Sequence, residues 1–217
     1  MELIRPAEIE RESMRIIDGE LAARGIVLHP ELAPVVKRVI HTTADFDYAA
    51  SLRFTAEAVQ KGVAALRGGV IVTDTNMARA GISRAAAEKL GCEVYCYMAD
   101  EAVAAEAKER GVTRAVVSME RALSEYPDAV LVIGNAPTAL LRVCEAIEAG
   151  TRPALVIGVP VGFVNVVESK ERALVVCERC GVPAIVAMGR KGGSKVAAAI
   201  CNALLYTAAG LLEPEKR

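Results

Sequence analysis

The sequence predicts an α/β fold with three layers, α/β/α, around a mainly parallel, Rossmann-like sheet that follows an N-terminal helical segment. Two observations support this prediction. From residue 69 onward, apolar runs rich in β-branched residues alternate with stretches rich in Ala, Glu, Lys and Arg, which is typical of repeated strand–helix units. The runs are apolar throughout rather than alternating with polar residues, as expected for strands that helices cover on both faces.

The N-terminal part, residues 1–68, has the pattern of three helices and contains no strand signal of comparable strength. Prolines suit the helix starts and glycines suit the helix ends: Pro6, Pro30 and Pro34, and Gly25, Gly68 and Gly69. No linker rich in Ser, Gly or Pro separates this part from the βα part at 69–212. We therefore expect a single domain over residues 1–217.

Six apolar runs are the strand candidates of the βα part: 69–73, 93–98, 114–118, 128–134, 153–159 and 183–189. The last three carry a glycine near the carboxyl end, and a helical pattern follows each of them. Ligands of parallel α/β sheets bind beyond the carboxyl ends of the strands. The segments 134–140, 158–165 and 189–195 are therefore expected to share one rim, and this rim is the predicted site.

Composition excludes several classes of protein. The 217 residues are 53% hydrophobic with a mean hydropathy of +0.32, which is enough apolar surface for a sizeable core and excludes a disordered chain. The 26 basic and 27 acidic side chains leave a net charge of −1, so no positive field attracts nucleic acid or a membrane surface. We expect neither as a partner.

The N-terminus is charged from its second residue and shows no secretory signal, so we expect a cytoplasmic protein. The most apolar segment, 196–212, is shorter than a typical membrane span and is better explained as a core helix. Among the six cysteines, Cys177 and Cys180 form a C-x2-C pair, but no second pair of ligands has suitable spacing. We expect reduced, mostly buried thiols and no metal site.

Two histidines offer the only imidazoles. His29 precedes a proline in a loop-like segment and suits a surface or capping role. His41 ends the second predicted helix, where the helix C-terminus favours a protonated imidazole, and spacing alone leaves both a structural and a catalytic role open. Asp45 and Asp47 follow, either as paired carboxylates for acid–base chemistry or, for Asp47, as a helix N-cap.

The segment 189–195, GRKGGSK, follows a strand candidate and opens the last helix. Its N–H groups, together with Arg190, Lys191 and Lys195, could cradle an anion, although a plain tight turn would explain the glycines equally. It is neither a Walker loop nor a G-x-G-x-x-G motif. The segments 134–140 and 74–83 add further polar side chains to the same predicted rim.

Long motifs of this chain resemble the precorrin-8X methylmutase family: RVIHTTADFD, TDTNMARAGI, IGNAPTALL, IGVPVGFVNVVESK and GVPAIVAMGRKGGSKVAAAICNAL. The resemblance covers about residues 5–210. It implies a cobalamin-pathway isomerase that moves a methyl group from carbon 11 to carbon 12 of a tetrapyrrole polycarboxylate, giving hydrogenobyrinate or its cobalt counterpart. It also implies a homodimer with sites near the subunit interface, and no cofactor.

The same resemblance assigns roles to individual residues. His41 takes the position of the catalytic histidine that protonates the macrocycle, and Ser13 and Arg38 take positions that contact substrate. The remaining candidate substrate-binding residues are Thr42, Asp74, Met77, Asn135, Thr138, Arg190, Gly192, Gly193 and Ser194. The stretch TTADFDY is larger and more acidic than expected of aerobic-type members, which leaves a cobalt-containing or a metal-free substrate open.

Two other functions stay open at this point. An α/β enzyme that binds a nucleotide or a sugar phosphate could use the segment 189–195 as its phosphate cradle. A non-catalytic corrinoid carrier would bind the same pigment without converting it.

Overall fold

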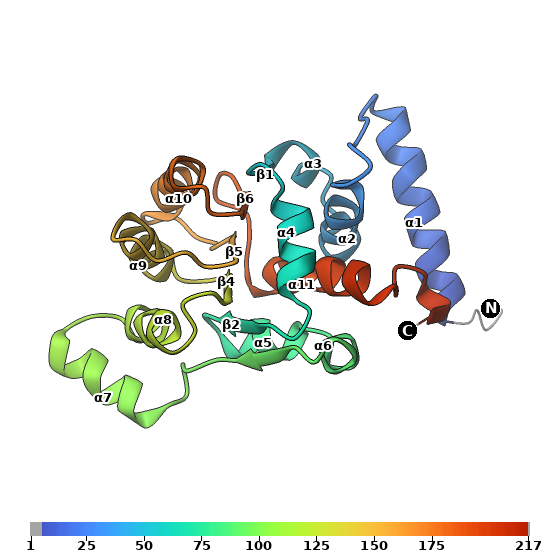
Figure 1. Ribbon diagram of the computed structural model, residues 1–217. Helices are drawn as coiled ribbons and strands as arrows, with labels where there is room; N and C mark the ends of the chain where they lie inside the picture. The colour runs from blue at the N-terminus through green and yellow to red at the C-terminus, as the bar shows by residue number, and fades with distance from the viewer. Residues whose placement is uncertain (1–5, 217) are drawn as a thin grey trace.

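The computed structural model describes residues 6–216, which form a single six-stranded sheet in the order β1-β6-β5-β4-β2-β3 (Figure 1). Five strands are mutually parallel, and β1 pairs antiparallel with β6 at one edge. The bounds are β1 (Leu52–Phe54), β2 (Val70–Thr73), β3 (Glu93–Tyr95), β4 (Val130–Ile133), β5 (Leu155–Gly158) and β6 (Ala184–Ala187). This is the expected α/β class with a mainly parallel sheet.

The helices connect these strands and cover the sheet. Their bounds are α1 (Pro6–Ala23), α2 (Ala33–Thr43), α3 (Tyr48–Ser51), α4 (Ala58–Ala65), α5 (Asn76–Gly81), α6 (Arg84–Leu90), α7 (Glu101–Arg110), α8 (Arg114–Glu125), α9 (Pro137–Glu148), α10 (Val166–Cys180) and α11 (Ser194–Ala209), followed by the 3₁₀ turn η1 (Pro214–Lys216). The predicted helix starts at Pro6 and near Pro34 are confirmed.

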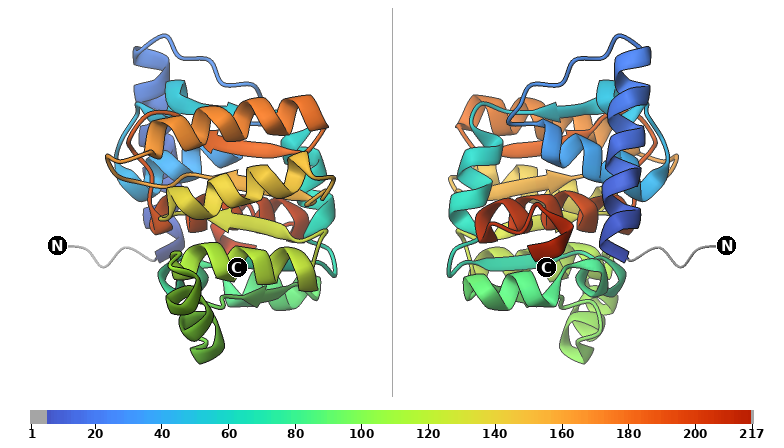
Figure 2. Two further views of the ribbon diagram at one scale, coloured as in Figure 1. Left: turned by 90° about the vertical axis from the view of Figure 1, so that its left-hand side faces the viewer. Right: turned by 90° about the vertical axis from the view of Figure 1, so that its right-hand side faces the viewer.

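Alternate strand residues face two separate apolar layers. Ile71 and Val132 belong to the layer beneath α2, α4 and α11, whereas Val72 and Leu131 belong to the layer beneath α8, α9 and α10. The two views of Figure 2 show these helical layers on opposite faces of the sheet. Because both faces are covered, the central strands β4, β5 and β6 are buried along their whole length, which explains why their sequences are apolar throughout, whereas the edge strands β1 and β3 keep exposed residues.

Two predictions of secondary structure are wrong. The segment 114–118 is the first part of α8, because the Thr113 side chain caps the helix by accepting the N–H of Val116. The N-terminal part contains the strand β1, which interrupts the third predicted helix and leaves α3 and α4 on either side. A strand of three residues is too short to show a period, and its pairing with β6 depends on residues more than a hundred positions away.

The strand order identifies where a ligand can bind. Counted from β2, the parallel strands run 2-1-3-4-5 across the sheet, an order shared by one class of doubly wound folds. In this order the connections leave β2 and β4 in opposite directions, so a crevice opens between their carboxyl ends. The loops after β2 and β4 carry two of the predicted rim segments, 74–83 and 134–140.

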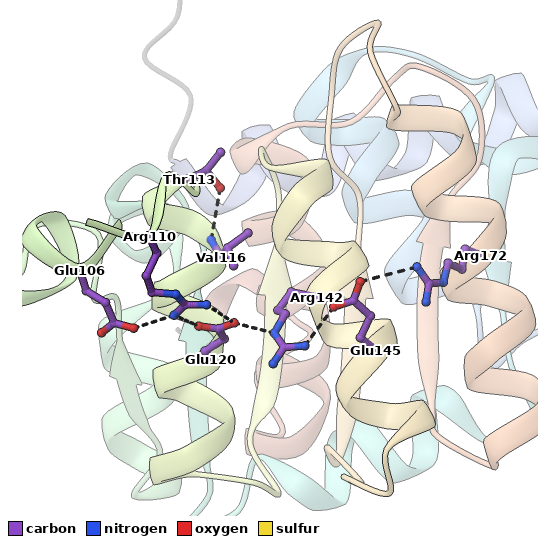
Figure 3. Close-up of polar contacts among 8 residues, drawn as sticks. All are labelled: Glu106, Arg110, Thr113, Val116, Glu120, Arg142, Glu145 and Arg172. Carbon is purple, nitrogen blue, oxygen red and sulfur yellow. Dashed lines mark hydrogen bonds and ion pairs between the residues drawn. The ribbon is translucent and has the colours of Figure 1, made fainter. Parts of the chain in front are cut away.

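Surface charge ties the outer helices together. Glu120 of α8 lies 2.5 Å from Arg110 of α7 and 2.7 Å from Arg142 of α9, and Arg142 continues to Glu145 at 2.9 Å (Figure 3). The Glu120 side chain is 20% exposed, which limits screening of these pairs by solvent. The chain of ion pairs therefore links three consecutive helices on the face opposite α11.

Replacing Glu120 with glutamine is expected to lower the free energy of unfolding by about 1–2 kcal/mol at pH 7, because two arginines lose their shared carboxylate. The hydrogen bond from Arg110 holds the pKa of Glu120 below its usual value. The stabilisation is therefore present above the ordinary glutamate pKa of about 4.3 and is lost as pH falls through the lower pKa of the folded state. Urea unfolding of both proteins at pH 7 and at several pH values below about 4 measures this difference. Glu88→Gln, which removes an exposed pair within α6, is the control and should leave the midpoint unchanged.

Four of the cysteines, Cys92, Cys144, Cys177 and Cys201, are buried, and Cys96 and Cys180 are partly exposed. All six are free thiols, and burial raises the pKa of Cys177 to about 12 and that of Cys144 to about 11. Such thiols are poor nucleophiles near neutral pH. Within residues 6–216 no helix combines the length and the apolar character that a membrane crossing requires.

Candidate functional site

Asp74 organises the crevice between β2 and β4. Its carboxylate accepts the backbone N–H groups of Gly134, Asn135 and Ala136, each at 2.8 Å. The side chain is completely buried, and burial raises its pKa while the three donors oppose that shift. Asp74 therefore has no surface to offer a ligand, and its expected role in substrate contact is corrected to holding the loop after β4.

The loops after four strands meet at this edge of the sheet, as the sequence predicts. The hydroxyls of Thr75 and Ser194 lie 2.8 Å apart, which connects the loop after β2 to the start of α11. The N–H of Gly193 donates to Val159 O at 2.9 Å, which connects the loop after β6 to the one after β5. We call the segment 189–193 the glycine loop.

Two glycines make this convergence possible. A Cβ on Gly192 would lie 2.2 Å from Val159 O and 2.8 Å from Pro160 O. A Cβ on Gly134 would lie 2.8 Å from the Cα of Ser194. All three distances are shorter than an ordinary van der Waals contact, so each position requires glycine for the loops to pack this closely.

Helix α2 carries the second group of predicted residues. Arg38 and His41 lie one turn apart, and His41 is in the last turn of α2, which is followed by the C-cap residue Ala44 in the left-handed conformation. The Arg38 guanidinium pairs with Glu10 of α1 at 2.5 Å and lies 5.2 Å from the centre of the Tyr206 ring of α11. His41 is half-buried and Thr42 is exposed.

The end of α2 is tied to the glycine loop. Lys191 Nζ donates to Asp45 and Asp47, each at 2.7 Å, and this pairing lowers the pKa of Asp45. Asp47 stands at the N-cap position of α3 but makes no capping hydrogen bond. The two aspartates thus bind Lys191, which is therefore not available as a free cation of the anion cradle. Their ion pairs bring the segment after His41 against the predicted rim.

A groove lined by residues of α1, α2 and α11 runs along α11. One hollow of about 240 Å³ is lined by Arg38, Thr42, Lys195 and Asn202, and a second, of about 550 Å³, continues past Arg38 and Tyr206 between α1 and α2. Arg38 and Tyr206 line both hollows. We call the two together the α11 groove. It joins Arg38 and Thr42, two of the predicted contact residues, beside the first turns of α11.

Exposed apolar side chains stand on the rim. Met77 is 73% exposed, and Phe163 and Val164 are 81% and 77% exposed, although most side chains of this size are buried. The Arg190 guanidinium lies 5.5 Å from the centre of the Phe163 ring. The sequence analysis missed Phe163; an aromatic residue in a loop beyond a buried strand is the signal that could have found it. An apolar surface bordered by a cation suits a flat ligand that carries carboxylates.

The remaining predicted residues are less central. Thr138 faces the N-terminus of α8, where its hydroxyl lies 3.0 Å from that of Thr113. The Ser13 hydroxyl donates to Ile9 O within α1, and Asn135 is exposed on the rim. Among residues 6–216, no group of three or more His, Cys, Asp or Glu side chains could hold a metal ion.

Comparison with known proteins gives one consistent family. A family model described as precorrin-8X methylmutase matches residues 8–207. A cobalt-precorrin-8 methylmutase of Salmonella typhimurium is 45% identical over 207 residues, covering 93% of this chain and 95% of the relative, and one of Priestia megaterium is 42% identical over 206 residues, covering 93% and 88%. A crystal structure of precorrin-8x methyl mutase from Thermus thermophilus superposes with a TM-score of 0.82 at 42% identity, covering 93% of this chain and 98% of that one.

Proposed function

Because the chain belongs to the precorrin-8X methylmutase family and is thus an isomerase of cobalamin biosynthesis, we propose that the α11 groove and the rim bind the tetrapyrrole and that His41 supplies a proton to it. One observation carries this proposal. The ion pairs of Lys191 with Asp45 and Asp47 join the end of the His41 helix to the glycine loop. These ion pairs support a site in which an acid–base side chain works together with anion-binding groups.

The reaction requires little beyond binding and one proton. Within the macrocycle, the bond from the methyl group to carbon 11 breaks as the bond to carbon 12 forms, so no external methyl donor and no redox cofactor is consumed. Protonation of the ring by His41 makes its π system a better acceptor for the migrating group. A positioned general acid contributes roughly 10²- to 10⁴-fold to the rate.

The binding groups match the substrate's two chemical characters. Phe163, Val164 and Met77 offer an apolar surface to the flat ring, and Arg38, Arg190 and the N–H groups of the glycine loop offer partners for its carboxylates. We propose contact roles for Ser13, Asn135, Thr138, Gly193 and Ser194 from the family resemblance, and for Thr42 because it lines the α11 groove. Asp74 supports the loop that carries Asn135.

Replacing Arg38 with alanine is expected to weaken product binding by about 1–3 kcal/mol through the loss of a charge-assisted contact. Calorimetry with hydrogenobyrinate measures the change. Arg15→Ala is the matched control, since Arg15 is exposed on α1 and its partner among the described residues is Glu12 in the same helix. If Arg38→Ala binds hydrogenobyrinate as tightly as Arg15→Ala does, Arg38 is not part of the binding site.

We propose a cobalt-containing substrate, since both relatives described above are named cobalt-precorrin-8 methylmutase. Anaerobic incubation with metal-free and with cobalt-loaded precorrin-8, followed by absorbance spectra of the bound pigment, tests both the activity and this preference. Conversion of the cobalt form at the higher kcat/KM supports the proposal. Faster conversion of the metal-free form would reverse the preference.

The same experiment separates the two other functions considered for this sequence. A carrier would bind pigment without changing its spectrum. An enzyme acting on nucleotides or sugar phosphates would bind those ligands in calorimetry and leave precorrin-8 unconverted. The curated relatives are named as methylmutases, which favours turnover of the tetrapyrrole.

We also propose a cytoplasmic homodimer, following the family resemblance. The exposed Phe163 and Val164 beside the rim are consistent with a surface that a second copy completes. Sedimentation at micromolar concentration tests this, and a single monomeric species would count against the dimer.

A further inference from the structure

Lys170 is the one fully buried basic side chain among the described residues. It lies in the second turn of α10, directly behind the glycine loop, and forms no ion pair within residues 6–216. Lysine is rarely buried without a carboxylate partner, because removing its charge from water is costly. A sequence that keeps a charge here, where a methionine would fill the same space, points to a use for that charge.

The Lys170 ammonium group binds the inner side of the glycine loop. Nζ donates to Gly189 O at 2.7 Å and to Lys191 O at 2.8 Å. Both acceptors are backbone carbonyls, so their dipoles stabilise the charge without neutralising it. Burial lowers the pKa of Lys170 to about 8.

These two hydrogen bonds fix the direction of two N–H groups. In a trans peptide the C=O and the N–H point in opposite directions, and no peptide bond of the described chain is cis. With Gly189 O and Lys191 O turned toward Lys170, the N–H groups of Arg190 and Gly192 point away from it. Neither N–H donates to an acceptor within residues 6–216, whereas the next N–H, of Gly193, binds Val159 O.

Charge at the loop favours an anion on that outer side. Asp45 and Asp47 outweigh the charge of Lys191 by one, while Lys170 and Arg190 make no ion pair within the described chain, so the two cations leave the loop with one net positive charge. The Lys170 charge is screened little by water because the side chain is buried. Two unused N–H donors therefore project from a peptide segment whose inner side is held by a positive charge.

We propose that Lys170 is a positioning residue for the methyl shift: it orients the Arg190 and Gly192 N–H groups so that both donate to one carboxylate of the substrate. This inference rests on the proposed tetrapyrrole function and deepens it. Lys170 does not touch the pigment. The two N–H groups that it orients bind a carboxylate at one place on the ring, and this contact positions the macrocycle relative to His41.

The test compares Lys170→Met with Lys89→Met, a control on the exposed side of α6, after circular dichroism has shown that both proteins are folded. Two ligands are titrated by calorimetry: hydrogenobyrinate and the same corrin with its carboxylates converted to amides. Lys170→Met is expected to weaken binding of the carboxylate form by roughly 10- to 100-fold and to bind the amide form within threefold of the wild type. In kinetics, KM rises by a similar factor while kcat falls less. Equal losses for both ligands, or no loss, would overturn the proposal.

A measurement on the wild-type protein covers the case in which Lys170→Met does not fold. Amide resonances of Arg190 and Gly192 are expected to move downfield when hydrogenobyrinate is added. The Gly68 amide, which already donates to Leu90 O at 2.8 Å, serves as the reference that stays in place. Unmoved Arg190 and Gly192 signals in a protein saturated with pigment would refute the role of Lys170. Absence of turnover of precorrin-8 by the wild type is a separate result, which would refute the proposed function itself.

Discussion

His41→Ala is expected to reduce kcat for the methyl shift by roughly 10²- to 10⁴-fold while the Kd for hydrogenobyrinate changes by less than about tenfold. The imidazole is proposed to act by giving a proton as the methyl group migrates, so its contribution arises mainly in the transition state. His41 lies in the last turn of α2, between Arg38 and Thr42, which line the α11 groove, and close to the segment that Lys191 anchors. Anaerobic single-turnover kinetics and calorimetry with product measure the two quantities separately.

His29→Ala is the matched control, because it removes the chain's other imidazole from the loop before α2. It should leave both kcat and Kd at their wild-type values. Parallel losses of rate and affinity in His41→Ala would instead identify His41 as a binding group. A His41→Ala protein with undiminished kcat would require another proton donor.

The rim could be predicted from the sequence because the signals that define it are close together along the chain. A buried strand that ends in glycine and continues into a helical pattern specifies both the strand direction and the edge at which its loop emerges. The loops after β2, β4, β5 and β6 accordingly meet where the sequence predicts. The same local reasoning failed for 114–118, because a run of β-branched residues also suits the buried face of an amphipathic helix.

The connection between His41 and the rim could not be predicted. It depends on ion pairs between Lys191 and two aspartates about 145 residues earlier in the chain, and a charged side chain in a sequence does not reveal its partner. From the sequence, Lys191 has the character of an anion-binding group and Asp47 that of a helix cap. Only the three-dimensional packing of α2 on α11 shows that Lys191 and Asp47 form an ion pair.

The buried roles of Asp74 and Lys170 could not be predicted from the sequence either. Asp74 resembles a polar rim residue because it directly follows a strand, yet its carboxylate is turned inward to three N–H groups. Lys170 lies in a charged stretch of α10 that is indistinguishable from a solvated helix face until its depth is known. Sequence patterns indicate which segments reach a site, whereas the direction of each side chain is set by tertiary packing.

Gly192→Ala is expected to lower kcat/KM by at least 10²-fold and the free energy of unfolding by about 1–3 kcal/mol. The barrier is steric rather than conformational, since the φ angle of Gly192 lies outside the left-handed region. An alanine Cβ would meet Val159 O at 2.2 Å and Pro160 O at 2.8 Å, and both are backbone atoms at the end of β5 that cannot turn aside as a side chain would. The glycine loop must therefore move away from the loop after β5, and its N–H groups lose their direction.

Gly19→Ala provides the contrast, because a Cβ at that position in α1 meets no heavy atom within 4 Å. It should raise the free energy of unfolding by roughly 0.5–1 kcal/mol through helix propensity and leave turnover unchanged. Thermal unfolding and steady-state kinetics of both variants give the comparison. A Gly192→Ala protein with wild-type kcat/KM would show that the glycine loop can shift without cost to catalysis. Its N–H groups could then not be the fixed partners of a substrate carboxylate, since a displacement of about 1 Å is enough to break such a contact.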